Sequence, residues 1–213
     1  MPNWVSNTLN ITVDTAEKRA EIMARLGAPV LRATSNDGTW EVETEARSHL
    51  SYWNIIAPPA DKYEEYFGLS GWKDGERHGD GEYNWYNWNN ANWGCKWDAT
   101  EVDVDTSDYK NNLFNVTYHF ESPWSPPEGF FAKLAEAYPD ADMSMEFREE
   151  QGWGGELQST GDGQISLIRE WDIPASHQDW IDSGDEDGCV CLWGDGSHYD
   201  DCPEDNWKEK ESE

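Results

Sequence analysis

Tryptophans and asparagines gather in the segment 83–97, which is the strongest candidate for binding chemistry in the chain. The candidate ligand-binding residues are Trp85, Trp88, Asn90, Trp93 and Trp97. Indole faces stack on nucleobases or sugars, at about 1–3 kcal/mol per base in single-strand binders, and an asparagine amide can hydrogen-bond a ligand. The same residue types also build small cores under irregular loops, because tryptophan buries well and asparagine satisfies loop backbone groups. Both interpretations stay open, and we favour the packing one.

A second candidate, for metal chemistry, lies near the C-terminus. Cys189, Cys191, His198 and Cys202 could supply the three thiolates and one imidazole of a structural zinc site. Their C-x-C and H-x3-C spacings are tolerable but not typical, and a buried tail can hold cysteines without any metal. Zinc is therefore a hypothesis here, and no other cofactor is indicated. An EF-hand calcium loop starting at Ser183 is excluded, because its register places Gly194 where the bidentate glutamate belongs.

Catalytic motifs are missing from the sequence. It contains no phosphate-binding loop, no G-x-S-x-G turn and no H-E-x-x-H helix. His119 lies in an alternating segment and could be a sheet-surface side chain as easily as a base. Acid pairs are so abundant that proximity in sequence selects none of them for glycoside chemistry. We therefore favour a non-enzymatic protein and keep a hydrolase as an open alternative.

The charge balance narrows the class of partner. The chain carries 44 acidic and 15 basic residues, for a formal net charge of -29. Such a surface repels phosphates, and nucleic-acid binding normally needs lysine and arginine to release counterions. An anionic membrane surface would repel it as well. The sequence thus predicts no direct binding to nucleic acid or membrane, and leaves a basic protein partner, a cation, or a charge that only confers solubility.

The expected cellular location of the protein follows from the targeting signals that its sequence does not show. No apolar run approaches the roughly 20 residues of a membrane-spanning helix, and residues 1–10 have neither the basic start nor the apolar stretch of a secretory signal. Four cysteines, three of them crowded near the C-terminus, do not suggest a disulfide framework for 213 residues. These features predict a cytoplasmic protein.

Hydrophobic periodicity predicts the elements that would position these residues. Alternation predicts strands over 7–13, 99–105, 113–121 and 142–149, and apolar stripes predict helices over 15–26 and 126–138. Asp14 with Glu17 resembles a capping box for the first helix. Ser125, followed by Pro126, is a typical start for the second. Phe131 and Leu134 fall on the stripe of that second helix and are predicted to be core residues.

The order of these elements predicts an α+β protein with a ferredoxin-like βαββαβ sandwich and both helices on one face of the sheet. A Trp/Asn-rich insertion over about 28–97 follows the first helix, and an extra hairpin with a turn at 152–155 follows the last strand. The domain is expected to span 1–172. The remaining residues, 173–213, form an acidic tail whose tryptophans and cysteines predict partial docking.

Several short motifs resemble one protein family. They are Met1-Pro2-Asn3-Trp4-Val5-Ser6-Asn7, Trp53-Asn54-Ile55-Ile56 to Pro58-Pro59, Asn84-Trp85-Tyr86-Asn87-Trp88, Asn92-Trp93-Gly94 with Lys96-Trp97-Asp98-Ala99, and Trp124-Ser125-Pro126-Pro127. Together they resemble the YubB-like, Api-type ferredoxin-like family of phage and conjugative-plasmid proteins, over roughly residues 1–171. The resemblance implies the fold and a mobile-element origin, and it carries over no catalytic residue. Val5 and Cys95 depart from the cysteine and threonine that family members often show, which argues against a metal or redox site at those positions.

Three functions remain in order of preference. The first is a phage or plasmid accessory protein that acts in the host cytoplasm, where its acidic surface binds a basic groove on a defence or nucleic-acid-handling protein. The second is a ligand-binding or RNA-recognition-like module that uses the Trp/Asn cluster. The third is a hydrolase. A spread of carboxylates over one face of the protein would favour the accessory protein. An aromatic pocket would favour the ligand-binding module, and a buried carboxylate or histidine in a cleft would favour the hydrolase.

Overall fold

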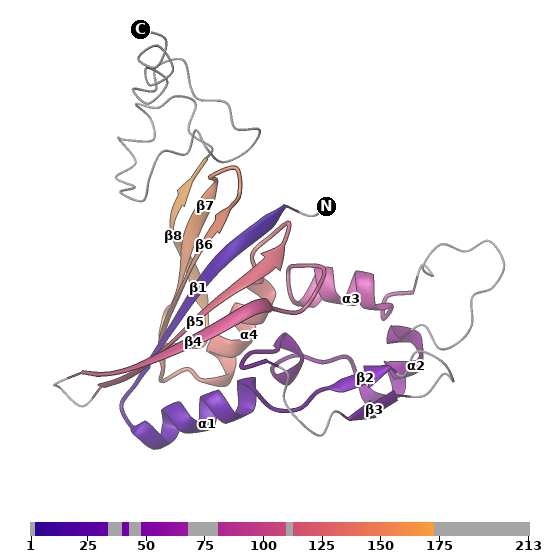
Figure 1. Ribbon diagram of the computed structural model, residues 1–213, viewed down its shortest axis with the longest axis horizontal. Helices are drawn as coiled ribbons and strands as arrows, with labels where there is room; N and C mark the ends of the chain where they lie inside the picture. The colour runs from indigo at the N-terminus through magenta and orange to yellow at the C-terminus, as the bar shows by residue number, and fades with distance from the viewer. Residues whose placement is uncertain (1–2, 34–39, 43–47, 68–80, 110–112, 173–213) are drawn as a thin grey trace, which may run out of the picture.

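The computed structural model (Figure 1) describes residues 3–33, 40–42, 48–67, 81–109 and 113–172. The predicted docking of the tail, 173–213, lies outside these residues, as do Cys189, Cys191, His198 and Cys202. No helix within the described ranges combines the length and apolar character that a membrane crossing requires.

A six-stranded antiparallel sheet forms the centre of the fold, in the order β4-β5-β1-β6-β7-β8 (Figure 1). Its strands are β1 (Trp4–Val13), β4 (Thr100–Tyr109), β5 (Leu113–Pro123), β6 (Asp142–Glu149), β7 (Gly154–Ser159) and β8 (Ile165–Trp171). The four strands predicted from alternation are thereby confirmed, within a few residues at each end. β7 and β8 form the additional hairpin that extends the sheet beyond β6.

Alternation along each strand separates a buried face of the sheet from an open one. In β1 the alternate residues Val5, Asn7, Leu9, Ile11 and Val13 are buried, whereas the residues between them are half-buried or exposed. Leu9 pairs with Tyr118 of β5 and with Met145 of β6, both of which are also buried. Since side chains opposite each other on paired strands share a face, one face of the central strands carries the core.

Two helices cover that face. α1 (Ala16–Leu26) contributes Ile22 and Leu26 to the core, and α4 (Glu128–Ala137) contributes Phe130, Phe131 and Leu134. All five side chains belong to one hydrophobic cluster with the buried residues of β1, β5 and β6, so both helices lie on the same side of the sheet. With β4, β5 and β6 as the second, third and fourth strands of the βαββαβ order, this is a ferredoxin-like sandwich, as predicted.

The predicted caps of both helices are wrong. Thr15, not Asp14, caps α1, since its Oγ1 accepts a hydrogen bond from the backbone N–H of Lys18 at 3.2 Å. α4 begins at Glu128 without any side-chain cap. The hydroxyl of Ser125, which was expected to cap it, instead donates to the carbonyl of Gly94 at 2.6 Å and so ties the start of the helix to the segment that precedes β4.

Short elements fill the chain between α1 and β4 and lie together to one side of the sheet (Figure 1). They are the strands β2 (Leu31–Ala33) and β3 (Trp40–Val42), the 3₁₀ helices η1 (Tyr52–Asn54) and η2 (Ala60–Lys62), and the helices α2 (Tyr63–Tyr66) and α3 (Trp85–Asn92). Tyr52 anchors them to the core, because it is fully buried with its ring 4.6 Å from that of Phe130. The expectation of an irregular loop over 83–97 is wrong for 85–92, where α3 starts at the Asn84 cap.

Candidate functional site

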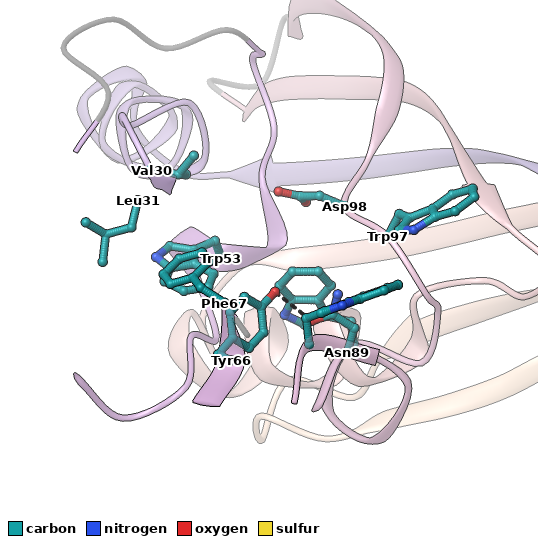
Figure 2. A pocket seen from close by; sticks show the side chains of 10 residues that line it. Val30, Leu31, Trp53, Tyr66, Phe67, Asn89, Trp97 and Asp98 are labelled. Atoms are coloured by element: carbon teal, nitrogen blue, oxygen red, sulfur yellow. Dashed lines mark hydrogen bonds between the residues drawn. The ribbon is translucent and has the colours of Figure 1, made fainter. Parts of the chain in front are cut away.

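An aromatic pocket of about 360 Å³ lies among these elements. Figure 2 shows Trp53, Tyr66 and Phe67 grouped on one side of it and Trp97 on the other. The remaining lining residues are Val30, Leu31, Trp85, Asn89, Trp93 and Asp98. The volume is within the range of small-molecule sites, which are mostly apolar with a few placed polar groups. We refer to this cavity as the aromatic pocket.

The rings of the pocket hold one another in place. Trp53 lies 5.2 Å from Tyr66 and 5.9 Å from Phe67, measured between ring centroids. The indole N–H of Trp93 donates to the carbonyl of Ile56 at 2.9 Å. The hydroxyl of Tyr66 donates to Asn89 Oδ1 at 2.9 Å (Figure 2), and the Asn89 amide donates in turn to the carbonyl of Lys96. These contacts fix the walls of the pocket.

Asp98 supplies the carboxylate of the pocket. Its oxygens accept hydrogen bonds from the hydroxyl of Ser51 at 2.5 Å and from the backbone N–H groups of Tyr52 and Ala99 at 2.7 and 3.0 Å. Desolvation raises the pKa of the Asp98 carboxyl above its ordinary value, and these three donors oppose the shift. The contacts to Ser51 and Tyr52 fix the start of η1, so the carboxylate has a structural role irrespective of any ligand.

The structure brings some of the predicted ligand-binding residues together and separates others. Trp85, Trp93 and Trp97 line the aromatic pocket. Trp88 instead stacks on Tyr83 at 5.4 Å, and the exposed Asn90 donates to the carbonyl of Tyr86. Neither of these two residues lines the pocket. The asparagine that lines the pocket is Asn89, which is only 3% exposed, and not the predicted Asn90.

Helical spacing explains which residues the sequence could have selected. Trp85, Asn89 and Trp93 are spaced i, i+4 and i+8, so they share one face of α3 and its C-terminal end. This signal was available, because Asn84 is a good N-cap whose Oδ1 accepts from the N–H groups of Tyr86 and Asn87. No sequence signal connects this face to Trp53 and Phe67, which reach the pocket through tertiary packing.

The other face of the sheet is open and strongly acidic. Its register aligns Asp103 with His119, Thr8, Glu146, Glu156 and Arg169 in one row across the sheet. Further carboxylates on this face are Asp105, Glu121 and Asp142, and the other arginine is Arg148. Arg169 lies 3.5 Å from a Glu146 oxygen and 3.9 Å from a Glu156 oxygen, so its charge is already shared between them. We call the sheet surface that carries all the side chains named in this paragraph the open face.

The centre of the open face differs from a nucleic-acid platform. RNA-recognition folds stack bases on aromatic side chains of the two central strands. At the centre of β1 and β5 this protein carries Thr8, Asn10, Thr117 and His119 instead. Thr8 Oγ1 lies 3.2 Å from His119 Nδ1, and the Thr117 hydroxyl donates to Asn10 at 2.8 Å. These side chains form a polar surface in which the imidazole of His119 takes the place of the larger aromatic rings.

Metal chemistry has no arranged donor set among the described residues, and the carboxyl group that the pocket offers for acid–base chemistry, Asp98, already accepts three hydrogen bonds. No group of three or more histidine, cysteine, aspartate or glutamate side chains is arranged there to hold a metal ion. Cys95 is buried, and burial raises the pKa of its thiol well above the ordinary value, so it is not a reactive thiolate. No histidine lines the aromatic pocket in the described part of the chain.

A match to a family model agrees with the fold. Residues 93–189 match the family model described as the ferredoxin-like domain in Api92-like protein. The matched stretch begins at the end of α3 and contains β4 to β8. A crystal structure of the protein Api92 from Yersinia pseudotuberculosis aligns with 81% of this chain and 100% of its own, at 11% identity and a TM-score of 0.45. Among curated proteins, no significant match is found.

Proposed function

We propose that this chain is a non-enzymatic accessory protein of a phage or plasmid, and that its open face binds a basic groove on a host protein that normally handles nucleic acid. The observation that carries the proposal is the excess of carboxylates on the open face, set among threonine and asparagine side chains. Such a surface matches positive charge and offers no stacking platform. Complementary potentials steer association and exclude wrong partners.

The geometry suits competition with nucleic acid. Neighbouring strands of a sheet lie about 4.8 Å apart, so carboxylates on β4, β6 and β7 form a two-dimensional array of negative charge rather than a single point. An array of this kind can occupy several arginine or lysine side chains of a phosphate-binding groove at once. The partner would therefore lose access to DNA or RNA while the complex persists.

Neutralising the open face tests this proposal. The variant Asp103→Asn/Asp105→Asn/Glu146→Gln/Glu156→Gln removes four charges from it. The matched control Asp14→Asn/Asp140→Asn/Glu17→Gln/Glu21→Gln removes four exposed charges on or beside the helices. We expect the wild type and the control to retain one partner from a bacterial lysate at about 0.15 M salt, where screening is strong beyond about 8 Å, and the open-face variant to retain at least about tenfold less.

The bound partner should be released by added DNA or RNA. Equal retention by both four-charge variants, or capture only of abundant basic proteins that wash off at about 0.15 M salt, would show that the charge serves solubility alone.

A second function is supported by the aromatic pocket. We propose that it binds a small neutral ligand with a planar or apolar face, since six aromatic side chains line it and, among the residues that the structure describes, no lysine or arginine does. A phosphate-bearing ligand would meet the carboxylate of Asp98. Stacking on the exposed part of the rings would provide most of the affinity.

Titration with neutral nucleosides and monosaccharides, followed by NMR of the indole N–H signals, tests the pocket. We expect a saturable shift that Trp85→Ala abolishes, because Trp85 lines the pocket. Trp88→Ala is the matched control, since Trp88 stacks on Tyr83 outside it. If no member of either ligand class shifts the indole signals at millimolar concentration, or if both variants respond alike, the pocket is a packing feature only.

A further inference from the structure

The ammonium group of Lys96 lies among four aromatic rings. Its Nζ is 4.7 Å from the ring centroids of Trp97 and Trp124, 5.6 Å from that of Tyr86 and 5.9 Å from that of Trp85. Each distance is within the roughly 6 Å at which a cation is attracted to a ring face. We call these four rings the ring cage. Cages of this kind are how proteins recognise ammonium ligands.

The ring cage faces solvent. Tyr86, Trp97 and Trp124 retain 46%, 37% and 44% of their surface exposed, which is unusual for such large rings. Trp85 and Tyr86 come from α3, whereas Trp124 follows the end of β5. Exposed aromatic rings that gather at one place on a protein surface are typical of interaction sites.

Trp124 is held in its position at a conformational cost. Its φ of 62° lies in the left-handed region, where a bulky side chain costs on the order of 1–3 kcal/mol. The backbone N–H of Trp124 donates to the carbonyl of Asn3 at 2.8 Å, which fixes this conformation. Strain of this kind persists where the surrounding structure requires it, and here its result is a tryptophan ring presented over Lys96.

Lys96 is suited to leave the cage. Within the described part of the chain its ammonium has no carboxylate within ion-pair distance, and the aromatic rings are its electrostatic neighbours. Its stem has four rotatable carbons and can carry the charge into water at little cost. An incoming cation would restore the same ring contacts that Lys96 gives up.

The cage adjoins the open face. The Trp97 ring lies 5.5 Å from that of Trp124 and 6.3 Å from that of Trp4, at the start of β1. Trp4 precedes Ser6, whose hydroxyl donates to the open-face residue Glu121 at 2.8 Å. A basic partner on the open face would therefore have its next cationic side chain within reach of the cage.

We propose that the ring cage is a binding site for an ammonium or guanidinium group, and that Lys96 occupies it until a lysine or arginine side chain of the partner displaces it. That the group belongs to a protein rests on the function proposed above, whereas the cage itself does not. Lys96 acts as an internal competitor. Only the fraction of molecules in which Lys96 has left the cage can bind the incoming cation, and the apparent affinity for that cation is reduced to the same fraction of its intrinsic value.

Tetramethylammonium chloride is the probe, with sodium chloride at equal ionic strength as the blank. Lys96→Met keeps the packing of the stem and removes the competitor. If Lys96 fills the cage about nine-tenths of the time, this variant should bind tetramethylammonium about tenfold more tightly than the wild type. Lys62→Met is the matched control, because Lys62 lies over the single ring of Tyr83, 5.0 Å away, and its loss should leave the affinity unchanged.

Two further measurements secure the interpretation. Adding Trp124→Ala to Lys96→Met should weaken tetramethylammonium binding at least about tenfold, since it removes a ring at 4.7 Å. In the wild type, the side-chain NMR signals of Lys96 should be shifted upfield by the rings and should move toward their free values as the probe is added. This second readout needs no variant to fold.

Equal affinities of the wild type, Lys96→Met and Lys62→Met would overturn the proposal, as would Lys96 signals that stay fixed while the probe shifts the indole signals. The open-face variant should bind tetramethylammonium as the wild type does. If no partner is captured but the protein still responds to tetramethylammonium, the proposed protein partner is wrong and the cation site stands. Its ligand would then be a free organic amine. Failure of the probe alone would remove the site and leave the partner.

Discussion

Replacing Phe131 by alanine should lower the free energy of unfolding by about 3–5 kcal/mol. Phe131 is fully buried on α4 and belongs to the single cluster that joins this helix to the sheet. The variant loses the transfer free energy of the ring and leaves a cavity that a close-packed core refills only in part. The expected result is a lower midpoint in urea with an unchanged slope.

Tyr109→Ala is a suitable control for that measurement. Tyr109 is 51% exposed at the end of β4, so its truncation should change the stability by no more than about 0.5 kcal/mol. An unchanged midpoint for Phe131→Ala would remove α4 from the core and contradict the arrangement of both helices on one face.

Gly129→Ala should also destabilise the protein, although the same change in a helix usually gains up to about 1 kcal/mol. A Cβ atom at Gly129 would lie 2.3 Å from the carbonyl oxygen of Asn92 and 2.9 Å from its carbon. Both are backbone atoms, so α4 or the end of α3 must shift. Overpacking of this kind costs about 1–3 kcal/mol and sometimes more, which outweighs the gain in helix propensity.

The glycine variant also tests how α4 supports the aromatic pocket. The N–H of Phe130 donates to the carbonyl of Trp93, so a shift of α4 should move a pocket-lining residue and alter the indole N–H spectrum. Glu136→Ala, on the exposed side of α4, should change the stability by no more than about 0.5 kcal/mol and leave that spectrum intact. A glycine variant as stable as the wild type would show that the close contact with Asn92 is relieved at no cost.

The sheet and its two helices could be predicted because each has a strong local pattern. Val116, Tyr118 and Phe120 alternate with polar residues along β5, and Phe131 with Leu134 marks the stripe of α4. The caps could not be predicted, because a serine hydroxyl has competing acceptors. The hydroxyl of Ser125 bonds the distant Gly94 instead of its own helix, and only the tertiary structure decides between the two.

The sequence predicts only some of the residues that line the candidate site. The sequence predicts a cluster of the tryptophans at 85, 93 and 97 but not the helix α3, and it therefore selects Asn90 where the structure has Asn89. Trp53, Tyr66 and Phe67 come from a segment separated from them by a long connection, and no periodicity links the two. The ring cage was missed for the same reason, because Trp124 reaches Lys96 only after β4 and β5 have folded back on each other.

The central position of β1 has a consequence for how the chain folds. β1 pairs with β5, where Leu9 meets Tyr118, and with β6, where Leu9 meets Met145. Both partners follow more than a hundred residues later in the chain. Sheet formation therefore has to close very long loops, whose entropic cost precedes any gain from strand pairing. During synthesis β1 is made first, has neither neighbour until β5 has emerged, and gains its second neighbour only when β6 follows. Its apolar side chains are therefore exposed longest and depend on α1 or a chaperone for cover.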